Sequence, residues 1–143
     1  MPRPTAKQRL TASMIANAAE IQANLYLVTD QLCAAIEEVP ALEAVYRGLK
    51  GKLELHTADL LLAASDLGRL DGKNAETREA QFAVFCGEFP SITEMRAAVE
   101  TSRYELETSK ASVEAETIAF TAARYGARLQ AATMEMVAAT SEK

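Results

Sequence analysis

The last third of the chain, from Ser91 to about Ala139, has the pattern of one uninterrupted helix. It contains no proline and one glycine, Gly126. An apolar residue recurs at every seventh position, as in a helix that packs along a continuous seam; these residues are Ile92, Val99, Leu106, Val113, Phe120, Ala127 and Met134. Such a helix would be roughly 70 Å long, whereas a compact globule of 143 residues has a radius of gyration of about 14–15 Å. The sequence therefore predicts an elongated protein, or one in which this helix packs against another copy.

Two segments have the spacing of a capping box, in which a Ser or Thr and a Glu or Gln three residues later bond each other's backbone N–H groups. Ser91 and Glu94 follow Pro90 and would open the long helix. Thr5 and Gln8 would open a first helix that runs from about residue 5 to 38. We therefore expect helices to begin at Thr5 and at Ser91.

The first helix has an apolar seam whose members lie alternately four and three positions apart: Met14, Ala18, Ile21, Leu25, Val28, Leu32, Ala35 and Val39. A second apolar line widens the face and favours a bundle of three or more helices; it holds Ala12, Ala19, Tyr26 and Cys33, with Ile15 and Ile36 nearby. Val39-Pro40 is expected to break the helix, because proline cannot continue the backbone hydrogen bonds. A connection this short would send the next helix back antiparallel.

The second helix is expected over about residues 40–70 and to end at Asp71-Gly72. Its seam consists of Leu42, Tyr46, Leu49, Leu53, His56, Leu60, Ala63, Leu67 and Leu70. Gly48 and Gly51 share one face, where they allow close helix approach or act as a hinge. Asn74 is expected to cap a short helix over residues 75–87.

The sequence thus predicts an all-α fold, an elongated antiparallel helical bundle or coiled coil with three long helices and one short one. We expect a single domain over residues 1–143, with helices at about 5–38, 40–70, 75–87 and 91–139. The short helix either continues the direction of the second helix or folds back on it. If it continues, its aromatic rings lack a covering helix.

A homo-dimer or higher homo-oligomer would cover those rings. The predicted oligomer interface is Phe82, Phe85, Phe89 and Tyr104. Tyr104 belongs to a second line on the last helix, about 140° from the main seam; this line is Ala97, Tyr104, Ala111, Ile118, Tyr125 and Ala132. A helix that is apolar on two sides packs on two sides, either within a bundle or with one side against another subunit.

Composition and charge narrow the function classes. The net charge of −5 argues against general binding to nucleic-acid backbone. No window approaches 18 or so consecutive apolar residues, so we expect no membrane-spanning helix, and the N-terminus has no apolar segment followed by a cleavage site. Cys33 and Cys86 lie far apart, and we expect both to be reduced, packed thiols of a cytoplasmic protein.

No constellation of side chains points to catalysis. The chain has one histidine, His56, which falls in the seam of the second helix and is expected to be hydrogen-bonded there. It lacks the grouped ligands of a zinc or di-iron site, so we expect no catalytic residues, no metal and no cofactor. The densest basic patch is Tyr46, Arg47, Lys50 and Lys52, which is either a solvated face or an anion contact. The chain is not expected to be an enzyme.

Two stretches carry a resemblance to a known group of proteins: Glu43-Ala44-Val45-Tyr46-Arg47, and the element Gly72 to Gln81, which reads G-K-N-A-E-T-R-E-A-Q. Followed by a long alanine- and glutamate-rich helix, they resemble small all-helical proteins of phages and prophages. Some of those lie among recombination and replication genes. The resemblance implies a phage-encoded accessory protein in the cytoplasm of a bacterial host.

The leading hypothesis is a non-enzymatic helical interaction protein, an accessory protein or inhibitor that acts on a protein of nucleic-acid metabolism or host defence. One alternative is an oligomer that binds and sequesters a nucleotide or nucleic acid through Tyr46, Arg47, Lys50 and Lys52. Another is a structural component of the virion. The expected partners are a second copy of the chain and another protein, with nucleic acid less favoured.

Overall fold

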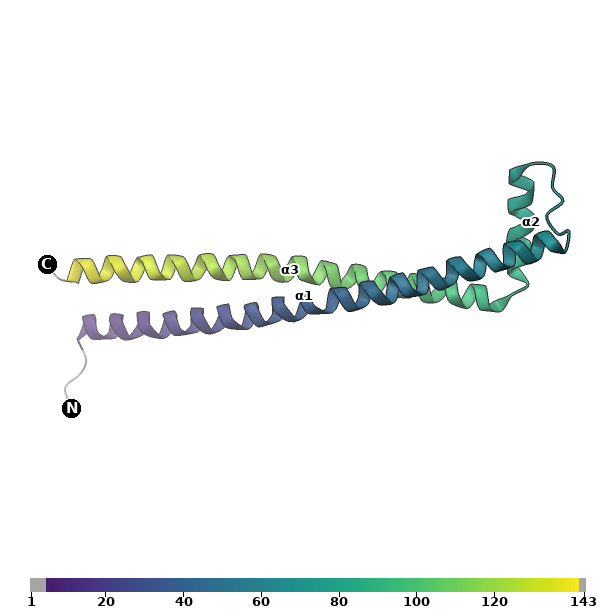
Figure 1. Ribbon diagram of the computed structural model, residues 1–143. Coiled ribbons are helices and arrows are strands. Elements are labelled where there is room, and N and C mark those ends of the chain that lie inside the picture. The colour runs from purple at the N-terminus through teal and green to yellow at the C-terminus, as the bar shows by residue number, and fades with distance from the viewer. Residues whose placement is uncertain (1–4, 142–143) are drawn as a thin grey trace. The chain divides into compact units, whose positions relative to one another are not determined.

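The structure is a computed structural model that describes residues 5–141. Helices hold 92% of these residues, and no strand occurs among them. They are α1 (Ala6–Asp66), α2 (Ala75–Gly87) and α3 (Pro90–Ser141), and the two long helices pack against each other (Figure 1). The predicted all-α fold is confirmed. None of the helices in residues 5–141 is long and apolar enough to cross a membrane.

The chain divides into two compact units, which are described separately. The terminal unit pairs the part of α1 up to Glu37 with the part of α3 from Lys110 onward. The central unit is the segment Glu38–Ser109, which includes α2.

The predicted helix break at Val39-Pro40 is wrong, and with it the third long helix, because α1 continues through Pro40. The reason is visible in the seam. Ala35, Val39, Leu42 and Tyr46 keep the alternation of four and three positions across the proline, and all four are half-buried. Pro40 itself is exposed on another side of the helix. Keeping proline inside the helix costs about 3 kcal/mol. Breaking the helix would instead cost the packing of the seam, so the helix continues.

α1 ends earlier than predicted, at Asp66, and its terminator is Gly68 rather than Gly72. Gly68 adopts φ +66°, a left-handed conformation that suits glycine. Its N–H donates to the Ser65 carbonyl at 3.0 Å, and the Arg69 N–H donates to the Ala64 carbonyl at 2.9 Å. These two bonds form a Schellman motif, which closes the last turn of the helix.

Gly72 instead permits a close approach between the connection and α2. A Cβ atom at this position would lie 2.9 Å from Thr77 Cβ and 3.0 Å from the Arg78 nitrogen. The Gly72 N–H donates to Gln81 Oε1 at 3.0 Å. Asn74 caps α2 as predicted, since its Oδ1 accepts from the Thr77 N–H at 2.7 Å. The predicted range of α2 is also confirmed.

The core of the central unit lies where α2 crosses the C-terminal part of α1 (Figure 1). Its buried members are Leu60, Ala64, Phe85, Cys86 and Ile92, with Leu53, Ala63, Leu70, Phe82 and Phe89 partly buried around them. Arg69 closes one side: its guanidinium lies 5.8 Å from the centre of the Phe85 ring and bonds both Glu88 carboxylate oxygens, at 2.7 and 3.0 Å. Thus α2 does not continue in the direction of α1.

The capping box predicted at Ser91 is absent, because α3 begins at Pro90 and Ser91 lies inside it. Proline suits the first helical position, where its missing N–H has no intrahelical partner to lose. The Ser91 hydroxyl lies 3.3 Å from His56 Nε2 on α1. The capping box predicted at Thr5 is confirmed: the Gln8 N–H donates to Thr5 Oγ1 at 3.3 Å and the Thr5 N–H to Gln8 Oε1 at 2.8 Å.

In the terminal unit α1 and α3 meet along the predicted seams. Met14, Ala18, Ile21, Leu25, Leu32 and Ala35 are half-buried, and Val28 is buried. Gln130 of α3 links the helices, accepting from Asn17 Nδ2 at 3.5 Å and donating to the Met14 carbonyl at 3.4 Å. The two residue numbers add up to 147 in the pair Asn17/Gln130 of the terminal unit, and also in the pairs Glu38/Ser109 and His56/Ser91 of the central unit, as expected where two helices run antiparallel.

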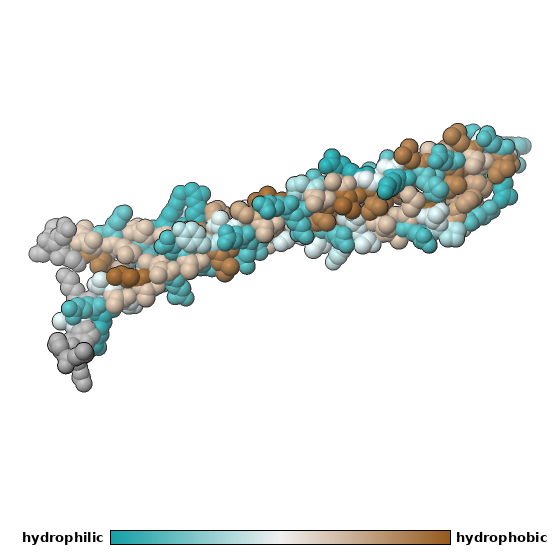
Figure 2. All heavy atoms as spheres, turned by 60° about the horizontal axis from the view of Figure 1, so that its bottom comes forward, coloured by the Kyte–Doolittle hydropathy of each residue, from teal (hydrophilic) through white to brown (hydrophobic). Residues whose placement is uncertain are grey.

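The terminal unit buries little. Val28, 8% exposed, is its only buried side chain among those described. Small residues such as Ala18 and Ala127 leave a groove of about 310 Å³ between the helices. In Figure 2 the end beside the grey termini is mostly pale tan, the colour of weakly hydrophobic residues, with a few brown patches among teal ones. This unit therefore has a seam but hardly a core.

Candidate interaction surface

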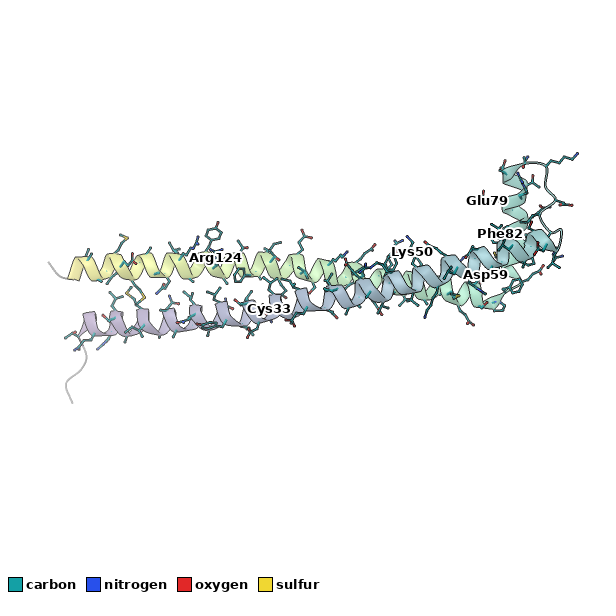
Figure 3. All side chains as sticks on the ribbon, viewed as in Figure 1. Cys33, Lys50, Asp59, Glu79, Phe82 and Arg124 are labelled. Carbon is teal, nitrogen blue, oxygen red and sulfur yellow. The ribbon has the colours of Figure 1, made fainter. Side chains whose placement is uncertain are left out.

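The structure places the predicted interface phenylalanines inside the chain's own core. Phe85 is 4% exposed, and its ring centre lies 5.1 Å from that of Phe89. Phe82 projects from α2 where this helix meets α1 (Figure 3) and packs against the same cluster. Tyr104, in contrast, is not buried: its side chain on α3 is 71% exposed. The premise that these rings lack a cover within one chain is wrong, because α2 lies across α1 instead of continuing its direction.

The predicted basic patch does not converge on one point. Tyr46 is half-buried in the seam, Arg47 Nε donates to the Glu43 carbonyl of its own helix at 3.3 Å, and Lys50 pairs with Glu54 at 3.9 Å. Lys50 and Lys52 are two residues apart on a continuous helix, which turns them about 200° from each other. The helix therefore turns Lys52 away from Lys50, whereas Arg47 and Lys50, three residues apart, share one face.

The remaining reactive side chains serve packing or lie alone. His56 is half-buried in the seam beside Ser91, as predicted. Cys86 is a buried free thiol, but Cys33 is exposed on α1 (Figure 3), so the expectation that both are packed is wrong for Cys33. Cys33 lies on a line of α1 that α3 does not cover. No group of three or more His, Cys, Asp or Glu side chains gathers into a candidate metal site within residues 5–141.

A shallow groove of about 370 Å³ lies beside α2. Ala80, Val84 and Phe85 contribute apolar atoms to its lining, and Arg69 and Glu88 contribute the charged ones. These two charges neutralise each other in their ion pair. The groove consequently offers no excess charge to a ligand.

The most distinctive surface is a continuous uncharged stripe on the part of α3 within the terminal unit. Its members lie alternately four and three positions apart, on the side away from the seam with α1: Ala111, Ala115, Ile118, Ala122, Tyr125, Leu129, Ala132 and Met136. All eight are exposed, and the large ones strongly so: Ile118 66%, Tyr125 66%, Leu129 72% and Met136 71%. We call these residues the outer stripe. It has the spacing of a packed helix seam, yet no other part of residues 5–141 packs on it.

Sequence reasoning found half of the outer stripe. The line through Ala111, Ile118, Tyr125 and Ala132 was predicted as a second apolar side of the last helix. The parallel line through Ala115, Ala122, Leu129 and Met136 was missed. Taken together, the residues of the two lines lie alternately three and four positions apart, and this spacing predicts a complete second seam. The structure adds that the surface is open in the single chain.

The outer side of α1 in the terminal unit is also exposed but less suited to packing. Its predicted second line, Ala12, Ala19, Tyr26 and Cys33, is exposed, as are Ile15 and Ile36. The exposed Asp30 and Glu37 interrupt this side of α1. Because burying an unpaired carboxylate is costly, the outer stripe of α3 is the better candidate for a contact.

The element from Gly72 to Gln81 has a local structural explanation. Gly72 makes room for Thr77, Asn74 caps α2, and Gln81 bonds both Gly72 and Asp71. Comparison of the chain with protein-family models, curated proteins and solved structures finds no match. The resemblance to phage proteins stays a prediction.

Proposed function

We propose that the protein is a non-enzymatic helical interaction protein that binds a protein helix through the outer stripe of α3. One observation carries the proposal: eight consecutive seam positions, none charged, lie open to solvent. Exposed apolar patches of this kind mark interaction sites on soluble proteins. In line with the sequence resemblance, we propose a phage-encoded accessory protein or inhibitor in the bacterial cytoplasm, acting on a protein of nucleic-acid metabolism or host defence.

The sparse burial of the terminal unit supports this proposal. Helices in proteins owe most of their stability to tertiary packing of an apolar face rather than to propensity. Here that packing amounts to one half-filled seam and one buried side chain, Val28, among those described. A partner helix on the outer stripe would supply the second packed face that α3 lacks.

We further propose that the two long helices form an antiparallel coiled coil, and that the protein is elongated and homo-oligomeric. The alternating seams of α1 and α3 and the shared register of their hydrogen-bonded pairs support the coiled coil. A coiled coil exposes its outer positions along its whole length, which suits a protein that recognises other helices.

Photo-crosslinking in cells tests the interaction surface directly. Tyr125 is replaced by the photo-reactive residue p-benzoylphenylalanine, and the same replacement of Glu79, exposed on α2 (Figure 3), is the matched control. The expected result is a covalent adduct at position 125 and none at 79, with the captured chain identified by mass spectrometry. Equal adducts at both positions, or none at 125, would refute the proposed surface.

A further inference from the structure

We infer that a second copy of this chain occupies the outer stripe, with the two α3 helices antiparallel about a two-fold axis between Ile118 and Ala122. The inference rests on the proposed function and names its partner. Isologous contacts need a surface that is complementary to itself. The outer stripe meets this requirement in the sizes of its side chains and in the charges beside it.

The large side chains of the stripe face small ones when it is paired with itself in this way. Ile118 meets the partner's Ala122, Tyr125 meets the partner's Ala115, and Leu129 meets the partner's Ala111. The two-fold axis repeats each contact in reverse. Each layer between Ala111 and Leu129 then joins one large residue to one alanine, which fills space evenly between two close helices.

If the partner helix is shifted by one heptad, large residues no longer face alanines in every one of these layers. In one direction Leu129 meets the partner's Ile118 while Ala115 meets the partner's Ala132, so one layer is overfilled and another is empty. In the other direction Ala122 meets the partner's Ala111, which also leaves a gap. Overpacked and underpacked layers both destabilise, so side-chain size selects a single register.

The charges nearest the two-fold axis fit the same register. Glu114 and Arg128 are exposed and border the same edge of the outer stripe. In the antiparallel pairing Glu114 lies opposite the partner's Arg128, and Arg128 opposite the partner's Glu114. Two opposite-charge contacts therefore flank the axis, and a shift of one heptad in either direction takes Glu114 away from the partner's Arg128. Farther from the axis, Glu107 lies opposite the partner's Glu135.

The other edge of the stripe is built for close approach. It carries Ser112, Ala119 and Gly126, all small, uncharged and exposed. A Cβ atom at Gly126 would meet nothing within 4 Å in the chain, so the chain's own packing does not explain a glycine inside α3. Glycine weakens a helix relative to alanine, and a second helix lying close along this edge gives it a reason.

Cysteine pairing tests the register in the full-length chain. The exposed thiol is first removed by Cys33→Ala, and Ala111→Cys and Leu129→Cys are then made separately and refolded either alone or as an equal mixture. Because these two positions face each other only across the antiparallel axis, the mixture should form a disulfide-linked dimer on oxidation, and neither variant alone should. A dimer of Leu129→Cys with itself would overturn this register, while leaving the outer stripe as an interaction surface.

Charge reversal provides a second test that needs no oxidation. Glu114→Arg and Arg128→Glu should each weaken self-association about tenfold, because each places two like-charge contacts across the axis. The double variant should restore it, and Glu79→Arg on α2 is the control for an equal change in net charge. Analytical ultracentrifugation measures all four against the wild type.

The outcomes separate the two proposals. A wild type that remains monomeric at tens of micromolar, or a double variant that is weaker still, would overturn the second copy as occupant. If the chain is monomeric and the photo-reactive residue at position 125 captures a different protein, the proposed function stands and only this inference fails. Capture of the chain's own α3 at the residues named above supports both.

Discussion

Replacing Pro40 by alanine should stabilise the protein, because Pro40 lies inside a continuous helix. At this position proline has no N–H to donate to the Ile36 carbonyl, and its ring crowds the preceding turn. Pro40 is exposed, so the substitution leaves the seam with α3 unchanged. The variant Pro40→Ala would therefore remove a helix defect without removing packing.

The expected gain is the difference between two effects. Proline is about 3 kcal/mol less favourable than alanine inside a helix. Proline also restricts the unfolded chain, and losing that restriction costs about 0.4–1 kcal/mol. The net increase in the free energy of unfolding is about 2 kcal/mol, which for a chain of this size corresponds to a rise in Tm of roughly 5–10 °C.

Urea unfolding followed by circular dichroism at the helical band measures this change, provided the slope of free energy against urea is the same in both proteins. Pro90→Ala is the matched control, since proline at the first position of α3 displaces no intrahelical bond. The control should change stability by less than about 0.5 kcal/mol. If Pro40→Ala gains no more than the control, or loses stability, α1 is interrupted at Val39-Pro40 and the continuous helix is wrong.

Four further substitutions test three separate features by the same unfolding measurement. Gly48→Ala should stabilise by about 0.5–1 kcal/mol, because a Cβ there meets nothing within 4 Å; a loss would reveal a neighbour from outside the chain. Phe85→Asp should destabilise by about 3–5 kcal/mol, since it empties a core position and buries a carboxylate, and a loss of self-association without any loss of stability would contradict the core assignment. Ser91→Ala should cost less than about 0.5 kcal/mol, whereas Asn74→Ala should cost about 0.5–2 kcal/mol as the loss of a true cap; equal costs would restore Ser91 as the cap.

Periodicity was the part of the sequence that predicted structure best. The residues expected in the seam of α1, from Met14 to Ala63, are half-buried or buried throughout. A side chain's face on a helix depends only on its position, so a pattern of four and three settles it without knowledge of the partner. The caps at Thr5 and Asn74 were predictable for a related reason: a capping side chain bonds a backbone group three residues away.

The failures occurred where local and distant interactions compete. Judged by proline's local chemistry, Val39-Pro40 predicts a break in the helix. The apolar seam, however, keeps its alternation of four and three positions across the proline, and this pattern in the sequence predicts a continuous helix. Gly68 and Gly72 both follow the last seam residues, and only the backbone conformation shows that Gly68 takes the left-handed position. The placement of Phe85 depended on the direction of α2, which is set by contacts such as that between Gly72 and Thr77 rather than by any pattern within α2.

The outer stripe, too, was only partly predictable from the sequence. That α3 is apolar on two sides follows from its sequence, but which side the chain itself uses does not, because both carry a heptad repeat. The side with Phe120 contacts α1, although its other seam line includes Gln130 and the half-buried Glu116. The outer stripe has no such polar members and remains open. A folding chain that packed only for its own stability would cover the less polar side first, so the exposure of the outer stripe is better explained by a contact formed after folding than by the internal packing of one chain.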